Sequence, residues 1–279
     1  MSYQADLARW FAQLHAGAQP LLLPNPWDLG SARLLRELGF QALATTSSGF
    51  AATLGRLDGA VTRDEALTHA GALAAASDLP ITADLENGFA DDPQGVAETV
   101  RLAIEAGLVG CSIEDYTGDP AGPMYCMEHA VARIAAAAEA AHAGRVHLVL
   151  TARAENHIRG NPDLADTIAR LRAYGEAGAD VLYAPGLTAI DDIRRVVREV
   201  GRPVNVLTVP GAPPVRELAA AGVARISTGG TLAMAAIDAV AQAARELLDD
   251  GTYAFLEPAR AGSALAKRAF APPAAGAGG

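Results

Sequence analysis

The chain has 279 residues, of which 51% are hydrophobic and 19% charged, which fits a globular protein with a large core and excludes a disordered chain. The net charge of −10 argues against nucleic acid or an anionic membrane as the main partner, and no apolar run is long enough to span a bilayer. Residues 1–17 include Asp6 and lack an apolar core, so we expect no signal peptide. The two cysteines provide no disulfide framework, which favours a reducing, cytoplasmic setting.

Short apolar runs alternate with helix-like stretches along the chain. After an amphipathic helix at residues 4–15, strands are predicted at 21–24, 42–45, 81–86, 109–113, 146–150, 180–184, 203–207 and 224–227. Helices are predicted at 31–38, 62–76, 92–107, 127–143, 163–178, 190–200, 215–221 and 232–248. Eight strand–helix alternations indicate an α/β fold, a (β/α)8 TIM-type barrel. No glycine-rich phosphate-binding motif follows the first strand, which argues against a dinucleotide-binding fold.

One domain accounts for most of the chain. We expect a single barrel domain with a C-terminal helical extension over residues 1–262, because residues 252–270 continue past the last barrel element. Residues 263–279 end in a small, Pro- and Gly-rich segment, and we expect them to form a largely flexible tail.

The third predicted strand ends in two carboxylates separated by one residue. An extended strand alternates its side chains, so Asp84 and Glu86 should point the same way. Two carboxylates at one strand end repel each other unless a cation lies between them, and hard oxygen ligands suit Mg²⁺ or Mn²⁺. The alternative interpretation is an Asp/Asn/Gly loop that only ends the strand.

The active site of such a barrel lies at the carboxyl ends of its strands. The polar side chains expected there are Thr46, Ser47, Ser48, Asp58, Asp84, Glu86, Glu114, Asp115 and Arg153. So many acids would have raised pKa values unless a metal or an arginine compensates them. We therefore predict a divalent cation held by few protein ligands and several waters, with Arg153 binding a substrate carboxylate through two N–H groups. The hydroxyls and backbone N–H groups of residues 45–49 would bind a second carboxylate or a developing oxyanion.

Six short segments, in order, resemble the isocitrate lyase/phosphoenolpyruvate mutase superfamily. They are Asn25-Pro26-Trp27-Asp28, Thr45 to Gly49, Leu54 to Asp58, Ala83 to Phe89, Ile113-Glu114-Asp115 and Thr151-Ala152-Arg153. Each segment alone is a weak signal, but the ordered set is specific and covers residues 20–250. The resemblance implies a barrel enzyme that forms or protonates a metal-bound enolate of a small 2-oxo acid.

The resemblance also implies a role for each matching residue. Asp84 maps to the acid that coordinates Mg²⁺, while Glu86, Glu114 and Asp58 map to acids that usually act through water. Arg153 maps to the arginine of the fifth strand, so Arg153 and Glu114 are the candidate catalytic residues.

The candidate substrate-binding residues lie on two strands besides the fifth. The resemblance implies that the loop after the second strand grips substrate oxygens, and the candidates there are Thr46, Ser47, Ser48 and Gly49. Asn205, on the seventh strand, could bind substrate or could satisfy neighbouring backbone groups.

The loop after the fourth strand departs from the family pattern. Carbon–carbon lyases of the family carry a catalytic cysteine there and phosphonate mutases a Lys and Asn-Ser pattern, whereas residues 116–125 contain neither. Cys126 follows where the next helix begins, without the cationic neighbours that would lower a thiol pKa. The proton donor could instead be Asp119, His157 or Cys126, and the chain resembles the Cys-less branch, carboxyvinyl-carboxyphosphonate phosphorylmutase-like or oxaloacetate decarboxylase-like.

These observations favour a Mg²⁺-dependent carbon–carbon lyase or decarboxylase acting on a small 2-oxo or 2-hydroxy carboxylate. The alternatives are a phosphonate or carboxyphosphonate mutase or hydrolase, and a barrel that binds a carboxylate without turnover. By resemblance we also expect a homo-oligomer, a tetramer or a dimer, since family members exchange a C-terminal helix.

Overall fold

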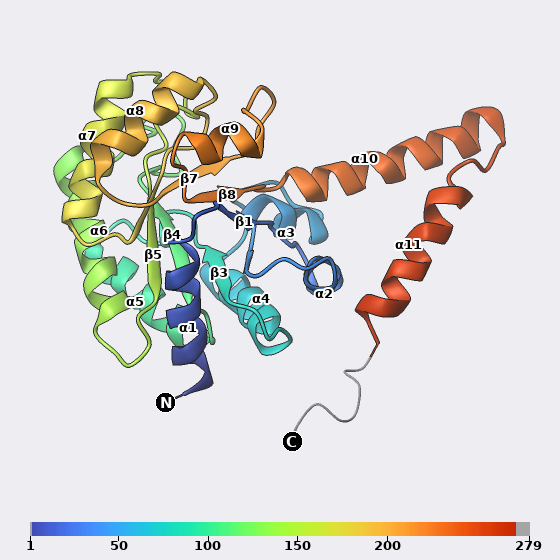
Figure 1. The fold of residues 1–279 in the computed structure, drawn as a ribbon, viewed down its shortest axis with the longest axis horizontal. Coiled ribbons are helices and arrows are strands. Elements are labelled where there is room, and N and C mark those ends of the chain that lie inside the picture. The colour runs from blue at the N-terminus through green and yellow to red at the C-terminus, as the bar shows by residue number, and fades with distance from the viewer. Residues whose placement is uncertain (1, 272–279) are drawn as a thin grey trace.

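The computed structural model describes residues 2–271, and it confirms the predicted (β/α)8 barrel (Figure 1). Its strands are β1 (Leu21–Leu23), β2 (Leu43–Ala44), β3 (Ile81–Asp84), β4 (Gly110–Glu114), β5 (Val149–Arg153), β6 (Val181–Tyr183), β7 (Val204–Leu207) and β8 (Arg225–Ser227). All pair in parallel in the order β1-β8-β7-β6-β5-β4-β3-β2. The amide of Ala44 donates to the carbonyl of Pro24 at 3.1 Å, which brings β2 beside the end of β1 and nearly closes the barrel.

Helices surround the sheet and follow the predicted order. They are α1 (Tyr3–Leu14), α2 (Leu29–Glu37), α3 (Ser47–Thr53), α4 (Arg63–Ala75), α5 (Pro93–Glu105), α6 (Met127–His142), α7 (Leu164–Glu176), α8 (Ile190–Val200), α9 (Val215–Ala220), α10 (Thr231–Arg245) and α11 (Leu256–Ala269). Side chains of β5 alternate between two clusters. Leu150 and Ala152 pack in the main core with the outer helices, whereas Val149 belongs to a second cluster that includes α1.

Helix α1 closes the amino-terminal end of the barrel. Its residues Ala8 and Phe11 are buried against Leu21 and Ala42 of the first two strand segments. A Cβ atom placed at Gly110 would lie 2.8 Å from Phe11 Cε1, so glycine is required where the helix meets β4. Because α1 packs against this end, the polar pockets of the barrel interior lie toward the carboxyl ends of the strands.

Two strand ends differ from the predictions. Glu86 was expected on the extended third strand, but β3 ends at Asp84 and Glu86 has a φ of 48°, so the alternation argument for this pair was wrong. The fifth strand was expected at 146–150, but β5 runs from Val149 to Arg153, which makes Arg153 the last residue of the strand.

The hydroxyl-rich segment after β2 was expected to be a loop and is a helix. Thr46 caps the short helix α3, and its hydroxyl accepts a hydrogen bond from the amide of Gly49 at 3.4 Å. Threonine is a favourable cap because its oxygen satisfies one of the amides that the first turn leaves without a partner. The cap fixes the start of the helix, and therefore Ser47 and Ser48, at the carboxyl ends of the strands, which form the mouth of the barrel.

The C-terminal segment forms an arm outside the barrel. Helix α10 continues into a π-helical turn, η1 (Glu246–Asp250), and projects away from the barrel before α11 runs back toward α2 (Figure 1). Arg268 of α11 forms an ion pair with Glu37 of α2 at 3.3 Å. Helix α11 reaches Ala269, so residues 263–269 of the predicted tail are helical, while residues 272–279 lie outside the described residues. No helix within residues 2–271 combines the length and apolar character that crossing a membrane requires.

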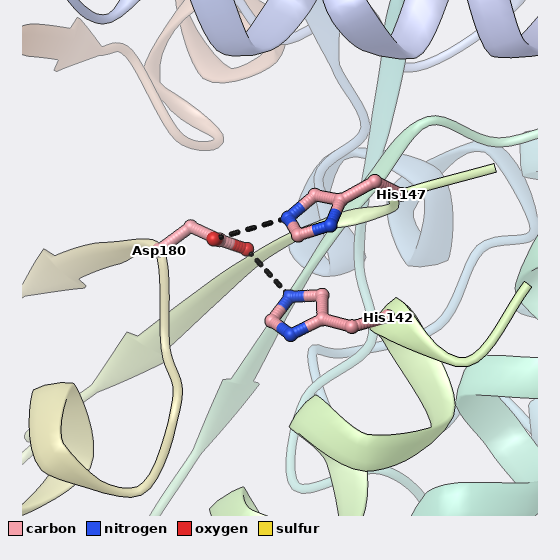
Figure 2. A group of neighbouring side chains, drawn as sticks. All are labelled: His142, His147 and Asp180. Atoms are coloured by element: carbon pink, nitrogen blue, oxygen red, sulfur yellow. Dashed lines mark hydrogen bonds and ion pairs between the residues drawn. The ribbon is translucent and has the colours of Figure 1, made fainter.

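Two stacked histidines share one carboxylate at the start of β6 (Figure 2). Asp180 accepts hydrogen bonds from His142 at 3.0 Å, from His147 at 3.3 Å and from the amide of Leu150 at 2.8 Å. Burial alone would raise the pKa of Asp180, but these hydrogen bonds outweigh burial and hold the pKa below its usual value. The carboxylate thus ties α6, β5 and β6 together.

We predict that Asp180→Asn lowers the free energy of unfolding at pH 7 by about 1–3 kcal/mol, because the amide cannot accept all three hydrogen bonds. The depressed pKa means that the unfolded chain takes up the proton first as pH falls. Stability from this carboxylate is therefore present above the unfolded pKa of about 4 and is lost below it. Urea unfolding between pH 3 and 7 measures both effects, with the exposed Asp191→Asn as control. Equal stability of the two variants would contradict the prediction.

Candidate active site

A single arginine gathers three acids at the carboxyl ends of adjacent strands. The guanidinium of Arg153 lies 3.1 Å from Asp84 Oδ1, 3.0 Å from Glu114 Oε2 and 2.8 Å from Glu155 Oε1. Burial opposes the charged form of Arg153, but these carboxylates outweigh it and hold the arginine pKa above its usual value. Asp84, Glu114 and Arg153 were predicted to converge at the mouth, and Arg153 contacts both acids there.

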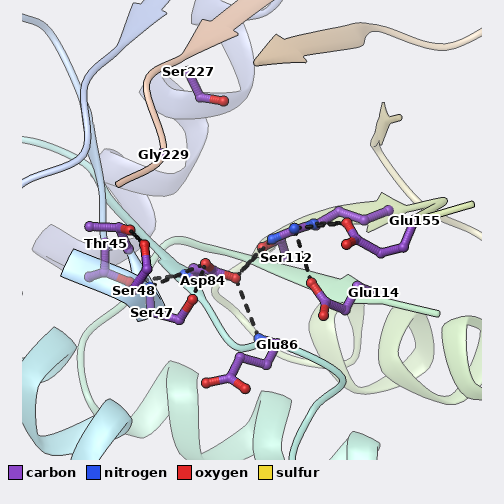
Figure 3. Close-up of polar contacts among 12 residues, drawn as sticks. Thr45, Ser47, Ser48, Asp84, Glu86, Ser112, Glu114, Glu155, Ser227 and Gly229 are labelled. Atoms are coloured by element: carbon purple, nitrogen blue, oxygen red, sulfur yellow. Dashed lines mark hydrogen bonds and ion pairs between the residues drawn. The ribbon is translucent and has the colours of Figure 1, made fainter. Parts of the chain in front are cut away.

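Hydroxyl groups orient the carboxylate of Asp84 (Figure 3). The amide and the hydroxyl of Ser47 donate to Asp84 Oδ2 at 3.3 and 3.1 Å, and the hydroxyl of Ser112 donates to Oδ1 at 3.4 Å. The amide of Asp84 donates in turn to the hydroxyl of Thr45 at 2.9 Å. Helix α3 and strand β4 therefore fix Asp84 from both sides, as a preorganised ligand requires.

A polar pocket of about 420 Å³ opens beside these groups, and its lining includes Ser47, Asp58, Glu86, Glu114 and Arg153. Burial, together with repulsion from Asp84 and Asp58, raises the pKa of Glu86 to about 7. Burial is also the main cause of the raised pKa of Glu114, which Arg153 only partly offsets. The mouth thus carries more acid than its arginines neutralise.

This donor set fits Mg²⁺. The available ligands are carboxylate and hydroxyl oxygens, which Mg²⁺ prefers, and the excess negative charge favours a cation. Within residues 2–271, the acids of the mouth do not bring three ligand atoms within 4.8 Å of one another; only His142, His147 and Asp180 do so. A cation at the mouth would therefore have few direct protein ligands and would keep several waters, with Asp84 as the best oriented ligand.

Of the predicted substrate-binding residues, Ser47 and Arg153 line the polar pocket, whereas Thr46, Ser48, Gly49 and Asn205 do not. Ser47 lines the polar pocket, and Ser48 lies next to Thr46, with 3.2 Å between their hydroxyl oxygens. Gly49 lies within α3, where a Cβ atom would come within 2.5 Å of Thr46 Cγ2, so it packs the helix and does not line the pocket. Asn205 is buried inside the barrel and donates to the hydroxyl of Ser227 at 2.9 Å.

Two charged residues of the mouth were not predicted. Glu155 is 1% exposed and binds Arg153, while Arg159 lies 3.3 Å from Glu155 and over the ring of Tyr116 at 3.6 Å. The signal for Glu155 was present, because Arg153 and Glu155 have the same spacing that was noticed for positions 84 and 86. Arg159 lies in the irregular turn after β5, and no periodicity in the sequence points to it.

Asp115 supports the mouth from behind. Its carboxylate accepts from the amide of Glu155 at 2.8 Å, from Arg170 at 3.0 Å and from the hydroxyl of Tyr174. It therefore positions the segment that carries Glu155 and does not face the pocket.

A family model described as phosphoenolpyruvate phosphomutase matches residues 11–248. The chain belongs to the phosphoenolpyruvate phosphomutase family. The 2-methylisocitrate lyase of Escherichia coli K12 is 32% identical over 205 residues, which cover 70% of this chain and 68% of the relative. Members of the wider isocitrate lyase/phosphoenolpyruvate mutase superfamily are lyases and mutases, and they are generally Mg²⁺-dependent. The chain is therefore an enzyme of a lyase superfamily.

Solved structures agree with this assignment. A Burkholderia cenocepacia J2315 protein, provisionally described as a lyase/mutase, is 52% identical, with a TM-score of 0.94 over 97% of this chain and 98% of that one. Oxaloacetate acetylhydrolase in complex with oxalate is 26% identical, with a TM-score of 0.81 over 93% of both chains. 2,3-Dimethylmalate lyase is 27% identical, with a TM-score of 0.80 over 91% of this chain and 90% of that one.

The loop after β4 is a hairpin and brings no cysteine to the mouth. Tyr116 and Met124 form an antiparallel bridge, and the amide of Thr117 donates to the carbonyl of Pro123 at 2.9 Å. Cys126 is exposed at the start of α6 and does not line the polar pocket. No cysteine of the described residues therefore lines the polar pocket.

We predict that Mg²⁺ affinity falls as pH decreases from 8 to 6, because Glu86 has a pKa of about 7 and its proton competes with the cation. Binding near pH 6.5 should release a proton, which isothermal titration calorimetry detects as a dependence of heat on the buffer. Glu86→Gln should remove most of this pH dependence, whereas the exposed Glu128→Gln should keep it. Affinity that is constant over this range in the unmodified protein would contradict the prediction.

Proposed function

We propose that the protein is a Mg²⁺-dependent carbon–carbon lyase or decarboxylase that acts on a small 2-oxo or 2-hydroxy carboxylate through an enolate. The observation that carries this proposal is the contact of Arg153 with Asp84, Glu114 and Glu155 beside a pocket lined by further acids. The family assignment supports it, since the curated relatives include 2-methylisocitrate lyases. Oxaloacetate decarboxylation is the simplest reaction that this set of groups could perform.

Each group has a role in this proposal. When bound, Mg²⁺ supplies Lewis-acid stabilisation of the negative charge that develops on the keto oxygen. Asp84 would hold the cation, with Glu86, Glu114 and Asp58 ordering its waters. Arg153 would bind a substrate carboxylate, because its charge is permanent and its N–H groups point in fixed directions. The hydroxyl and the amide of Ser47 both donate to Asp84 Oδ2, so they are directed at the place where the cation would be held. There they would contact a substrate oxygen.

Glu114 is the best-placed proton donor. It is 5% exposed, and burial raises its pKa, which favours the protonated acid. In oxaloacetate the bond between C3 and C4 would break, carbon dioxide would leave, and the electron pair would form the enolate of pyruvate. A proton passed from Glu114 to C3 would complete pyruvate, and solvent would restore the acid.

The missing loop cysteine supports decarboxylation over retro-aldol cleavage. Cleavage of a 2-hydroxy acid needs a base for the hydroxyl and an acid for the leaving enolate, whereas decarboxylation needs only the acid.

A phosphonate mutase or hydrolase is the second candidate. It is supported by a likeness to a Burkholderia cenocepacia protein provisionally described as a phosphonomutase, which is 38% identical with a TM-score of 0.82.

The projecting arm supports a homo-oligomer. Helix α10 and the turn after it expose Ile237, Val240 and Leu248, with exposed fractions of 50, 70 and 82%. An apolar stripe of this kind on a helix outside the core is typical of a surface that another copy covers.

We predict that the purified protein with Mg²⁺ converts oxaloacetate to pyruvate faster than Mg²⁺ alone, as followed by NMR. Arg153→Ala should lower kcat/KM by about 10²-fold or more, because a buried charged contact to substrate is lost. The exposed Arg216→Ala is the matched control and should keep full activity. Circular dichroism of Arg153→Ala must show a folded barrel, since the change leaves three acids without their partner.

Three further substrates separate the alternatives in the same assay. Cleavage of 2-methylisocitrate or dimethylmalate would establish a lyase that works without the loop cysteine. Conversion of phosphonopyruvate would establish the mutase or hydrolase function. No reaction with any of the four compounds would overturn the enzymatic proposal for this substrate class and favour a barrel that binds carboxylates without turnover.

A further inference from the structure

Arg225 is a buried cation without an acidic partner. It lies on β8 and is 4% exposed, and among residues 2–271 no carboxylate forms an ion pair with it. Its Nε donates to Asn205 Oδ1 at 2.9 Å, and its Nη1 lies 3.4 Å from His15 Nε2. Both contacts are hydrogen bonds to neutral groups, an amide and an imidazole, and neither supplies negative charge.

His15 is neutral and cannot serve as a counter-ion. Its Nδ1 lies 2.8 Å from the carbonyl oxygen of Phe11, which can only accept, so Nδ1 carries the proton and Nε2 accepts from Arg225. Burial and the neighbouring charge of Arg225 lower the pKa of His15 to about 4. At neutral pH the positive charge of Arg225 therefore remains uncompensated.

The other buried arginines have either acidic partners or several hydrogen bonds to backbone carbonyls. Arg153 contacts three carboxylates, and Arg170 contacts Asp115 and Asp166. Arg133 lacks an acid but donates to three backbone carbonyls and lies over the ring of Tyr125. A buried charge is costly unless it is paired. The uncompensated charge of Arg225 therefore points to a ligand that supplies the opposite charge.

A cavity of about 50 Å³ lies inside the barrel next to Arg225. Its polar lining includes Asp84, Arg153, Tyr183, Asn205, Arg225 and Ser227. Two of these side chains are cationic and one is anionic, which is the reverse of the acidic mouth. One water needs about 10–15 Å³ of such space, so the cavity has room for a small group such as a carboxylate but not for a whole substrate.

The groups around the cavity can recognise an anion. Asn205 holds Arg225 in place through Oδ1 and donates to Ser227 Oγ through Nδ2, so both side chains are fixed. Burial raises the pKa of Tyr183, which therefore stays protonated and can donate. Arg153 lines both this cavity and the polar pocket at the mouth, so a ligand bound in that pocket can reach inward.

We propose that Arg225 binds a second carboxylate of the ligand, deep in the barrel, and that the protein therefore selects dicarboxylates over monocarboxylates. The proposal rests on the proposed function only in placing the reacting part of the ligand at Asp84 and Arg153. Asn205 and Ser227 position Arg225 and complete the subsite. The substrate class is a short dicarboxylate whose inner end is small and unbranched.

The test measures anion binding without turnover, so it is independent of the proposed reaction. Malonate, acetate and inorganic phosphate are titrated by calorimetry against the full-length protein and Arg225→Gln. We expect malonate to bind the unmodified protein at least about 10-fold more tightly than acetate. Arg225→Gln should remove most of this preference, and the exposed Arg216→Gln should keep it. Phosphate that binds as tightly as malonate, or malonate that binds no better than acetate, would overturn the dicarboxylate subsite.

Two further variants distinguish binding from a purely structural role. Arg225→Met removes the cation that would bind the carboxylate, so we expect that malonate no longer raises the Tm of this variant. A lower Tm together with unchanged malonate affinity would assign Arg225 to structure alone and overturn the proposal. Ser227→Val fills the cavity without removing the cation and should weaken the binding of malonate at least about 10-fold. Unchanged malonate affinity would likewise contradict the subsite.

Discussion

The contact of Arg153 with three carboxylates is the interaction on which the mouth of the barrel depends. Asp84, Glu114 and Glu155 come from β3, β4 and the segment after β5, and without a cation among them their charges would repel. Parallel strands bring their carboxyl ends to one edge, so the barrel fold itself forces these acids together. The arginine makes that concentration of charge tolerable, and the remaining acid favours a divalent cation.

The surrounding elements hold this contact in place. Thr46 caps α3 and thereby aims Ser47 at Asp84, while Asp115 binds the amide of Glu155 from behind. These supports are buried and hydrogen-bonded, so the mouth is preorganised before any ligand arrives. At the opposite end, α1 packs against the barrel, so the polar pockets lie toward the mouth.

The two arginines that line the interior have opposite surroundings. Arg153 is surrounded by acids and contributes to a site that attracts a cation, whereas Arg225 has only neutral partners beside a small cavity. A ligand with one chelating end and one additional carboxylate would satisfy both environments. This pairing of an acidic mouth with a cationic interior links the family chemistry to a particular class of substrate.

The sequence alone determined the barrel and the acids of its mouth, because eight strand–helix alternations admit few folds and Asp84, Glu114 and Arg153 sit at strand ends. It did not determine local geometry. Glu86 lies beyond the end of β3 with a φ of 48°, and residues 47–53 form a helix where a loop was predicted. Only the tertiary structure revealed the uncompensated charge of Arg225, since whether a buried arginine has a counter-ion depends on neighbours such as His15, 210 residues away. Strand periodicity is local and readable in sequence, whereas charge compensation is decided by contacts between distant segments.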